Sequence, residues 1–367
     1  MIRILYVNGG LMNRGGIESY MMNYYRHFDR SKIQIDFIVH DAGGYGYYDE
    51  EIKKMGGRIF VLPKKSTHPF TYIHQLKKIL NNGEYKIIHT HMDAMGSWVL
   101  KAAKECGIPV RIAHSHNTQH LSTNPLKLFF LEKARKNINK YTTHRMACSD
   151  VAGRWLFGDK PFTVVRNAIE VERFAFDEEE RKRIRELYGV RDDEFLIGHV
   201  GRFDTQKNHT FLIDVFADVV REKPNCKLML VGEGHLMQSI KEKVSRLKLD
   251  KNVVFTGVRD DAYKYYNAFD LFVLPSLFEG LGIVAIEAEV NGCPSLLSSQ
   301  VPQAAKIAEN VSFVDLKKKA WVNSILSVTQ DKKDRNGALF NIYESDYNIN
   351  IESKKLQSLY FNLWNKN

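Results

Sequence analysis

Short apolar segments that resemble β-strands alternate with longer amphipathic segments along most of the chain, and this alternation restricts the fold more than any other feature. In the first half, the predicted strands are Ile2–Val7, Ile33–Val39, Arg58–Leu62, Ile87–His91, Val110–His114, Met146–Cys148 and Thr163–Val165. Apolar residues at helical spacing predict helices between them, at Glu18–Phe28, Tyr48–Met55, Thr71–Leu80, Ala94–Cys106 and Leu126–Asn139. This order is typical of a parallel sheet with helices on both faces.

The second half repeats the pattern. Its predicted strands are Phe195–Val200, Lys227–Val231, Val253–Thr256, Leu271–Leu274 and Ser295–Leu297, and its predicted helices are Thr210–Glu222, His235–Leu247, Ala262–Ala268 and Leu281–Asn291. Between the halves, the charged run Asp177–Arg185 predicts the start of a surface helix. We therefore predict an α/β fold of two Rossmann-like, doubly wound parallel-sheet domains that face a central cleft. The predicted domains are residues 1–170, residues 171–345, and a C-terminal helix in 346–367 that packs back on the first domain.

Composition agrees with two globular domains. The chain has 367 residues, of which 44% are hydrophobic and 26% are charged. Its four cysteines are far apart and form no CxxC pair, so neither a zinc site nor a disulfide framework is predicted. The N-terminal segment resembles a strand rather than a signal peptide, and no apolar run approaches the roughly 18 residues of a membrane span. We expect a cytoplasmic protein.

Positive charge is concentrated in the first half. Residues 1–170 contain 25 Lys and Arg against 14 Asp and Glu, a net charge of +11, whereas the remaining residues contain 28 against 29. Such an excess predicts a polyanionic partner for the first domain, either an anionic membrane, a nucleic acid or a phosphorylated acceptor. The alternative is a basic surface that only keeps the protein soluble.

Two loops of the second half have the composition of a phosphate site. After the strand Leu271–Leu274, a glycine-containing loop leads into an apolar helix, and a helix start of this kind favours phosphate. Glu279 lies in that loop, and Glu287 lies within the apolar helix, where it needs a partner or a cleft unless it is simply solvated on the outer face. The loop after Phe195–Val200 carries Arg202 and Lys207, which suit a diphosphate unless they are ordinary surface cations. The sequence has no Asp-x-Asp pair for Mg²⁺, so we expect no metal cofactor.

The first half also places polar residues after strands. A glycine-rich loop, residues 8–16, follows the first strand, but it lacks the GxGxxG spacing of a dinucleotide site. Four histidines end two neighbouring strands and predict a polar wall of the cleft, although a single histidine in such a place is more often a core or cap residue. They are His89, His91, His114 and His116, and they show no metal spacing with carboxylates.

Seven segments together resemble the retaining nucleotide-sugar glycosyltransferases of family 4, among them bacterial capsule and exopolysaccharide enzymes. In chain order they are G-G-I-E-S at 15–19, N-A-I-E-x-x-R-F at 167–174, G-R-x-x-x-x-K-N at 201–208, L-V-G-E-G at 230–234, F-T-G at 255–257, D-L-F-V-L-P-S-x-x-E-G at 270–280 and E-A-x-x-x-G-x-P at 287–294. The resemblance implies the two-domain GT-B architecture, retention of configuration, no metal, and a nucleotide-sugar donor, for which we expect a UDP-sugar. It departs from the family at residues 298–302, where the usual glycine-containing turn is replaced.

The resemblance also implies roles for individual residues. Arg202 and Lys207 would hold the donor diphosphate, and Glu287 would bind the ribose hydroxyls. Glu279 would lie beside the donor sugar, with His116 or His114 next to the reacting centre. The remaining donor contacts would be Gly16 at the phosphate, Val258 and Arg259 at the base, and the backbone amides of Gly280, Leu281, Gly282 and Ile283.

The acceptor is expected on the first domain. Residues 124–136 mix aromatic and aliphatic residues with cations, as in a basic amphipathic helix that rests on an anionic bilayer, and the cations are Lys127, Lys133, Arg135 and Lys136. On this reading the acceptor is a saccharide or lipid-linked saccharide, and the protein is peripheral on the inner face of the cell membrane. The alternative is a helix whose apolar side lies in the core.

Two other functions compete with glycosyl transfer. A nucleotide-sugar epimerase on the same fold would convert its donor without an acceptor. A polyanion-binding protein would explain the basic half, but no nucleic-acid-binding motif supports it, and we expect no nucleic-acid partner.

Overall fold

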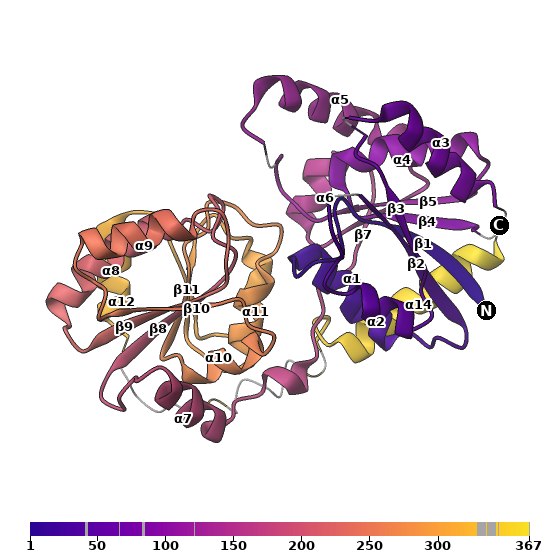
Figure 1. Ribbon diagram of the computed structural model, residues 1–367. Coiled ribbons are helices and arrows are strands. Elements are labelled where there is room, and N and C mark those ends of the chain that lie inside the picture. Colours follow the sequence, from indigo (N-terminus) through magenta and orange to yellow (C-terminus); the bar gives the residue numbers. More distant parts are fainter. Residues whose placement is uncertain are drawn as a thin grey trace. The chain divides into compact units, whose positions relative to one another are not determined.

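The computed structural model describes residues 1–40, 43–65, 67–82, 85–120, 122–328, 335, 343 and 345–366. The chain forms two compact units (Figure 1). Unit 1 comprises residues 1–169 and 346–367, and unit 2 comprises residues 170–345. Among the described residues, no helix combines the length and the apolar character needed to span a bilayer.

Unit 1 is built around a seven-stranded parallel sheet of order β3-β2-β1-β4-β5-β6-β7. Its strands are β1 (Ile2–Val7), β2 (Ile33–His40), β3 (Ile59–Leu62), β4 (Ile87–Thr90), β5 (Val110–Ser115), β6 (His144–Ala147) and β7 (Thr163–Val164). Its helices are α1 (Gly16–His27), α2 (Asp49–Lys54), α3 (Pro69–Leu80), the 3₁₀ turn η1 (Asp93–Met95), α4 (Gly96–Glu105), α5 (Pro125–Tyr141), α6 (Asp150–Phe157) and α14 (Ile349–Asn365).

Alternate residues of β1 face the two hydrophobic layers of unit 1. Ile4 and Tyr6 pack against α1, α2 and α14, whereas Leu5 and Val7 pack against α3, α4, α5 and α6. The helices of these two layers lie on opposite faces of the sheet (Figure 1). This follows from the two-residue repeat of a strand that is covered on both faces, which also explains why β1 is almost entirely apolar.

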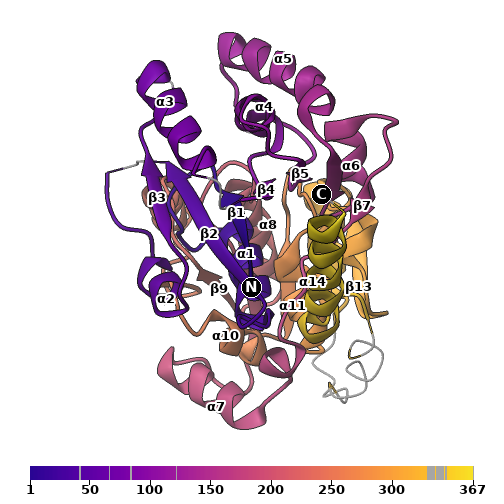
Figure 2. The ribbon, with the colours of Figure 1, turned by 90° about the vertical axis from the view of Figure 1, so that its right-hand side faces the viewer.

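The C-terminal helix α14 is part of unit 1. It contacts α1 (Figure 2), and its Leu356, Tyr360 and Leu363 are buried in the same core as Tyr6. The hydroxyl groups of Tyr360 and Tyr6 are 2.7 Å apart. A residue close to the C-terminus therefore lies beside the central strand of the first sheet.

Unit 2 has a six-stranded parallel sheet of order β10-β9-β8-β11-β12-β13. One face carries α8, α9 and α12, and the other carries α7, α10 and α11. The strands are β8 (Phe195–Val200), β9 (Cys226–Val231), β10 (Val253–Gly257), β11 (Leu271–Leu274), β12 (Ser295–Ser298) and β13 (Val311–Val314). The helices are η2 (Val171–Phe174), α7 (Glu178–Leu187), α8 (His209–Glu222), α9 (Met237–Arg246), α10 (Ala262–Ala268), α11 (Ile283–Val290), η3 (Gln303–Ala305) and α12 (Lys318–Leu326).

Strand order reverses once in each sheet, between β1 and β4 in unit 1 and between β8 and β11 in unit 2. In open α/β sheets, ligands bind beyond the carboxyl ends of the strands at this switch point. The topology therefore selects the loops after β1 and β4, and after β8 and β11, as the places where chemistry is expected. The prediction of doubly wound parallel sheets is confirmed.

Candidate active site

In the loop between β8 and α8, Arg202 is exposed to solvent and is held by Asp204 of the same loop. Arg202 is 68% exposed, and its Nε donates to Asp204 Oδ2 at 2.8 Å. The other oxygen of Asp204 accepts the backbone N–H of Lys207 at 3.2 Å. Gly201 precedes Arg202, and a Cβ there would lie 3.0 Å from the His199 ring and 3.3 Å from the Lys207 side chain. The glycine thus leaves room for Lys207 to fold back over the loop.

Lys207 joins this loop to the loop that follows β11. Its Nζ lies 2.7 Å from Glu279 Oε1, and the two side chains are 15% and 7% exposed. The same carboxylate accepts hydrogen bonds from Ser276 Oγ at 2.7 Å and Gln206 Nε2 at 3.1 Å. The two predicted motifs are therefore in direct contact at the switch point of the second sheet. The sequence did not identify Ser276 and Gln206 as site residues.

The start of α11 is shaped by a left-handed glycine. Gly282 has φ +89° and is the N-cap of α11 without a side-chain cap. A Cβ at this position would also lie 3.2 Å from Val301 Cγ1. The first N–H groups of α11 have no partners within the helix, so they favour an anion beside Lys207. The predicted helix 281–291 begins at Ile283 because Gly282 leaves the helical region.

Glu287, about one turn into α11, has a partner that the sequence did not indicate. The hydroxyl of Tyr266 on α10 donates to Glu287 Oε2 at 2.6 Å. Burial raises the pKa of Glu287 to about 7, although this hydrogen bond and the positive charges of Lys207 and Arg173 act in the opposite direction. The carboxyl group is therefore close to half-ionised at neutral pH and responds to any ligand that binds the charged form.

A second acidic residue of α11 is structural. Glu289 is fully buried, and its Oε2 accepts the backbone N–H groups of Ile307 at 2.7 Å and Ala308 at 2.8 Å. Its Oε1 has no hydrogen-bond partner among the described residues. Burial raises the pKa of Glu289 to about 8. Glu289 thus anchors the segment that follows β12, which is where the sequence departs from the family.

The predicted base contacts lie after β10. Val258 is 41% exposed, and Arg259 donates to Asp261 at 3.2 Å. Neither contacts the Lys207–Glu279 pair in any hydrogen bond or ion pair between described residues. They remain predicted site residues on the carboxyl edge of the same sheet.

In unit 1, the glycine-rich loop is held by an asparagine. Asn8 Nδ2 donates to the carbonyls of Gly10 and Leu11 at 3.3 and 3.2 Å and to Glu18 Oε1 at 2.8 Å. Gly16 opens α1 and is exposed. The sequence did not identify Asn8 as the residue that holds this loop beneath Gly16.

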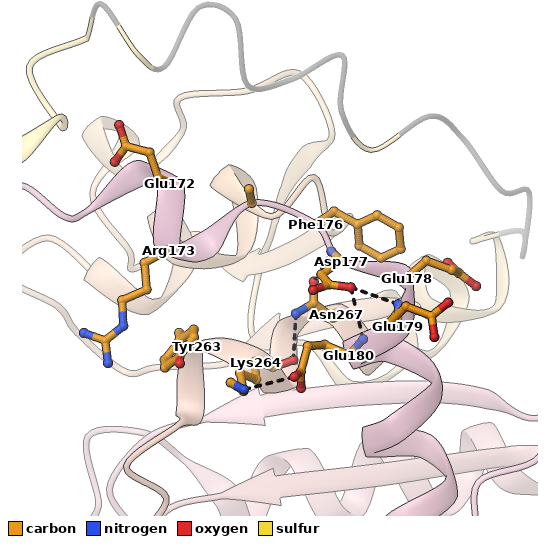
Figure 3. A pocket seen from close by; sticks show the side chains of 11 residues that line it. Glu172, Arg173, Phe176, Asp177, Glu178, Glu179, Glu180, Tyr263, Lys264 and Asn267 are labelled. Carbon is orange, nitrogen blue, oxygen red and sulfur yellow. Dashed lines mark hydrogen bonds and ion pairs between the residues drawn. The ribbon is translucent and has the colours of Figure 1, made fainter.

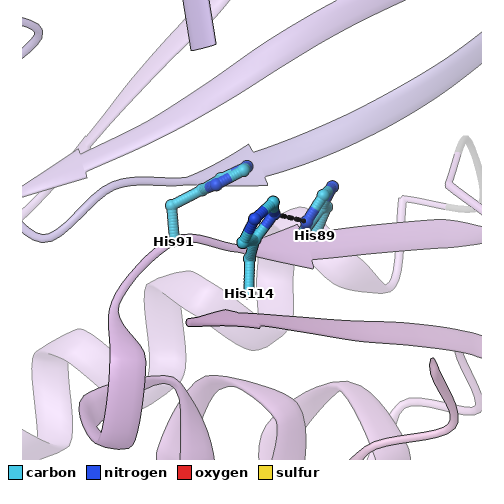
Figure 4. Close-up of side chains that lie close together, drawn as sticks. All are labelled: His89, His91 and His114. Atoms are coloured by element: carbon cyan, nitrogen blue, oxygen red, sulfur yellow. Dashed lines mark hydrogen bonds between the residues drawn. The ribbon is translucent and has the colours of Figure 1, made fainter. Parts of the chain in front are cut away.

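The four predicted histidines gather in one buried cluster at the carboxyl ends of β4 and β5. His89 and His114 make a ring-nitrogen contact of 3.1 Å, and His91 and His116 make one of 2.9 Å (Figure 4 shows the first pair with His91). All four are at most 7% exposed, and burial lowers the pKa of each below its usual value. They are therefore neutral imidazoles packed inside unit 1.

Helix α5 divides between core and surface. Leu131, Ala134 and Ile138 are buried, whereas the first turns expose Leu126 (69%), Phe129 (64%) and Phe130 (51%). The cations Lys127, Lys133 and Lys136 are exposed as well. Arg135 differs from the prediction because it is a structural residue, with its guanidinium bound to Glu132 and to the carbonyl of Trp155 at 2.6 Å.

Unit 2 also contains an open pocket of about 560 Å³ that is unsuited to a diphosphate (Figure 3). Five of its lining residues are acidic, Glu172, Asp177, Glu178, Glu179 and Glu180. Of its two cations, Lys264 is already paired with Glu180 at 2.9 Å. None of the predicted donor residues lines it, so the switch-point loops remain the candidate site.

Comparison with known proteins identifies the family of the chain. Residues 14–173 match the family described as Glycosyltransferase Family 4, and residues 180–339 match the family described as Glycosyl transferases group 1. The chain is 32% identical to EpsF of Bacillus subtilis, named as a glycosyltransferase, with 94% of this chain and 98% of EpsF aligned.

Two more distant relatives are informative. An Escherichia coli enzyme named UDP-Gal:alpha-D-GlcNAc-diphosphoundecaprenol alpha-1,3-galactosyltransferase is 23% identical over 86% of this chain and 85% of its own. The fold resembles that of Anabaena HepE, solved in complex with UDP and glucose, with a TM-score of 0.81 and 17% identity over 98% of this chain and 99% of HepE. These matches favour glycosyl transfer over the epimerase and polyanion-binding alternatives. The chain belongs to glycosyltransferase family 4 and is a glycosyltransferase of the GT-B fold.

Proposed function

We propose that the protein is a retaining, metal-independent glycosyltransferase. It moves a sugar from a UDP-sugar to a hydroxyl of a glycan or lipid-linked saccharide, in the synthesis of a cell-surface polysaccharide. The observation that carries the proposal is the 2.7 Å contact between Lys207 and Glu279. This contact joins the two loops of the switch point, and the second of these loops leads into α11.

Each charged group then has a role that its surroundings support. Arg202 and Lys207 bind the diphosphate together with the amides at the start of α11. Glu287 accepts the ribose hydroxyls in its ionised form, and Glu279 lies at the donor sugar. Val258 and Arg259 border the base.

This arrangement suits the charges that develop in the reaction. Breaking the sugar–phosphate bond leaves negative charge on the diphosphate and positive charge on the sugar ring. Fixed cations and a helix start stabilise the first, and the Glu279 carboxylate stabilises the second. Two side-chain cations and backbone N–H groups take the place of a Mg²⁺ clamp, so no metal is needed at the leaving group.

The relatives support the donor and the stereochemistry. The E. coli relative is named for UDP-Gal and for an alpha-1,3 product. UDP-galactose carries its sugar in α linkage, so an α product means retention. That relative is also named for a diphosphoundecaprenol-linked sugar as acceptor, and HepE was solved with UDP.

The test is a screen of nucleotide-sugars by thermal shift and by slow hydrolysis to the nucleoside diphosphate, with EDTA present. We expect one UDP-sugar to stabilise the protein and Arg202→Ala to abolish this effect. Arg221→Ala is the matched control, because Arg221 is also exposed and pairs with a nearby aspartate, Asp218, at 2.9 Å. No stabilisation by any donor, or equal losses in both variants, would refute the proposed donor site.

We further propose that the first turns of α5 bind an anionic bilayer, which would bring unit 1 to a lipid-linked acceptor. Three large apolar side chains are exposed there beside exposed lysines, the pattern of an interfacial helix. Arg135 is excluded because it holds α5 to α6 through the Trp155 carbonyl.

The test compares binding to phosphatidylglycerol vesicles before and after charge reversal. Reversal of Lys127, Lys133 and Lys136 to Glu should abolish sedimentation with the vesicles. The control reverses three exposed lysines of unit 2, Lys241, Lys248 and Lys251, and should retain binding. Unchanged binding of the α5 variant contradicts the proposal.

A further inference from the structure

Two H-x-H segments end neighbouring parallel strands and place four imidazoles on one face of the first sheet. Residues i and i+2 of a strand point the same way, so His89 and His91 align, as do His114 and His116. Ring centroids are 4.2 Å apart within each segment and 5.2 Å apart between His89 and His114. Imidazole rings this close together can bind one ion jointly through their nitrogens.

The cluster contains buried polar atoms with no hydrogen-bond partner among the described residues. They are His91 Nε2, His114 Nε2, His116 Nδ1 and the hydroxyl of Tyr20, whose ring lies 5.0 Å from that of His114. A buried polar atom without a partner costs about 1–3 kcal/mol. Several such atoms in one place call for an explanation, and an ion bound within the cluster is one.

We propose that His89, His91 and His114 bind a divalent transition-metal ion of the zinc class. One ring nitrogen from each lies within 4.8 Å of the others (Figure 4). His89 Nε2 and His114 Nδ1 are already 3.1 Å apart. Two nitrogens bound tetrahedrally at the usual zinc–nitrogen distance are about 3.4 Å apart, so this pair has nearly the spacing that a shared ion requires.

The second nitrogen of His89 is held as it is in many metal sites. His89 Nδ1 lies 2.6 Å from the Tyr360 hydroxyl, and that hydroxyl lies 2.7 Å from the Tyr6 hydroxyl. If His89 Nδ1–H donates to Tyr360, and Tyr360 donates to Tyr6, the lone pair of His89 Nε2 is left for the ion. Partners of this kind fix the ligand's tautomer and direction. Tyr360, carried by α14, is thus a positioning residue of the site.

The chemistry of the cluster selects the class of metal. All three proposed ligands are imidazole nitrogens, and neutral imidazole is the form that binds metals. Nitrogen ligands suit zinc, nickel or copper, whereas magnesium requires oxygen ligands. The site is therefore separate from any ion at a diphosphate. On the proposed function, it also assigns the substrate contact to His116, which at 7% is the most exposed of the four.

The experiment titrates the untagged full chain, stripped with chelator, with Zn²⁺ against a chromophoric competitor and with Co²⁺ alone. We expect one tightly bound equivalent and the strong visible absorption of tetrahedral Co²⁺. His89→Gln and His114→Gln should each weaken zinc binding at least ten-fold. His74→Gln, on the exposed surface of α3, should bind as the wild type does.

Tyr360→Phe keeps all three ligands and should weaken binding by about 10- to 100-fold, as loss of an outer-shell partner does. Absence of a stoichiometric Co²⁺ spectrum in the wild type overturns the proposal, as does equal weakening in the His74 variant. No sugar donor is needed, so this result is independent of the donor screen.

Discussion

Donor binding should depend on pH through a single carboxyl group, Glu287. Its pKa is raised to about 7 by burial, and a ribose whose hydroxyls donate to it binds the ionised form. The apparent affinity is then the intrinsic affinity multiplied by the ionised fraction, which is about one-tenth at pH 6 and nine-tenths at pH 8. Binding should therefore tighten about ten-fold over this range, or about 1.4 kcal/mol.

The ligand for this assay is an intact UDP-sugar, because its diphosphate is a diester with no proton to lose between pH 6 and pH 8. Isothermal titration calorimetry in buffers of different ionisation enthalpy should also detect release of nearly one proton per ligand at pH 6. The nearby His199 and His209 do not interfere, because burial lowers their pKa values to about 4 and about 2.

Glu287→Gln is the control, since it removes the titrating group and keeps Glu289, whose pKa of about 8 lies at the edge of the same range. Its affinity should be lower and should lose the ten-fold slope. Tyr266→Phe removes a hydrogen bond to the carboxylate, so the midpoint should move to higher pH. An unchanged slope in Glu287→Gln, or no proton release in the wild type, would refute the assignment of Glu287 to the ribose.

Three further predictions concern stability. Removing one partner of the Lys207–Glu279 pair leaves the charge of the other nearly buried and unpaired. The losses of unfolding free energy in Lys207→Met and in Glu279→Gln should therefore add up to more than the loss in the double mutant, by at least about 1 kcal/mol in urea unfolding. The pKa of Glu289 is higher in the folded state, so its contribution is full below about pH 4.5 and is lost as pH rises towards 8. The wild type should therefore lose about 2–3 kcal/mol relative to Glu289→Gln between pH 5 and pH 7. Gly198 on β8 lies against the ring of Phe269, where a Cβ would approach within 2.2 Å, so Gly198→Ala should cost at least about 1–3 kcal/mol in the same assay.

Each of these predictions has an outcome that contradicts it. If the losses of unfolding free energy in Lys207→Met and Glu279→Gln simply add in the double mutant, the ion pair contributes no coupling energy. The same pH dependence in the wild type and in Glu289→Gln would contradict the role given to Glu289. Gly10→Ala meets no atom within 4 Å and should be near neutral, so comparable losses at Gly10 and Gly198 would remove steric contact as the cause.

The sequence predicted the strands well where both faces of a strand are covered. Ile2–Val7, Phe195–Val200 and Leu271–Leu274 have the predicted bounds, because each is a mostly apolar run that is followed by a turn-forming residue, Asn8, Gly201 or Pro275. Short elements, and elements beyond the motifs, were missed. Helix α6 has only eight residues and starts from the Ser149 cap, and β13 and α12 lie where the family motifs end.

The motifs of the site were predictable, whereas their partners were not. Glycines, cations and the two glutamates occur at recognisable spacing along the chain. Tyr266, Ser276 and Gln206 meet those glutamates only after folding, and nothing local marks them. Arg135 was singled out as a cation beside an apolar stripe, and only folding shows that its guanidinium also donates to a carbonyl of the neighbouring helix, that of Trp155. The spacing of residues along the chain shows which side chains are available for a site, but their hydrogen-bond partners are decided by how the helices and strands pack.

The same distinction applies to the histidines of unit 1. As a sequence pattern, two H-x-H segments suggested a polar surface, because each histidine was considered against solvent. Folding instead places all four on one buried face of the sheet, where Tyr360 from the far end of the chain meets His89. The contact between α14 and the first sheet therefore connects the C-terminus to the chemistry of unit 1, and a truncation that removes α14 should weaken metal binding even where the sheet persists.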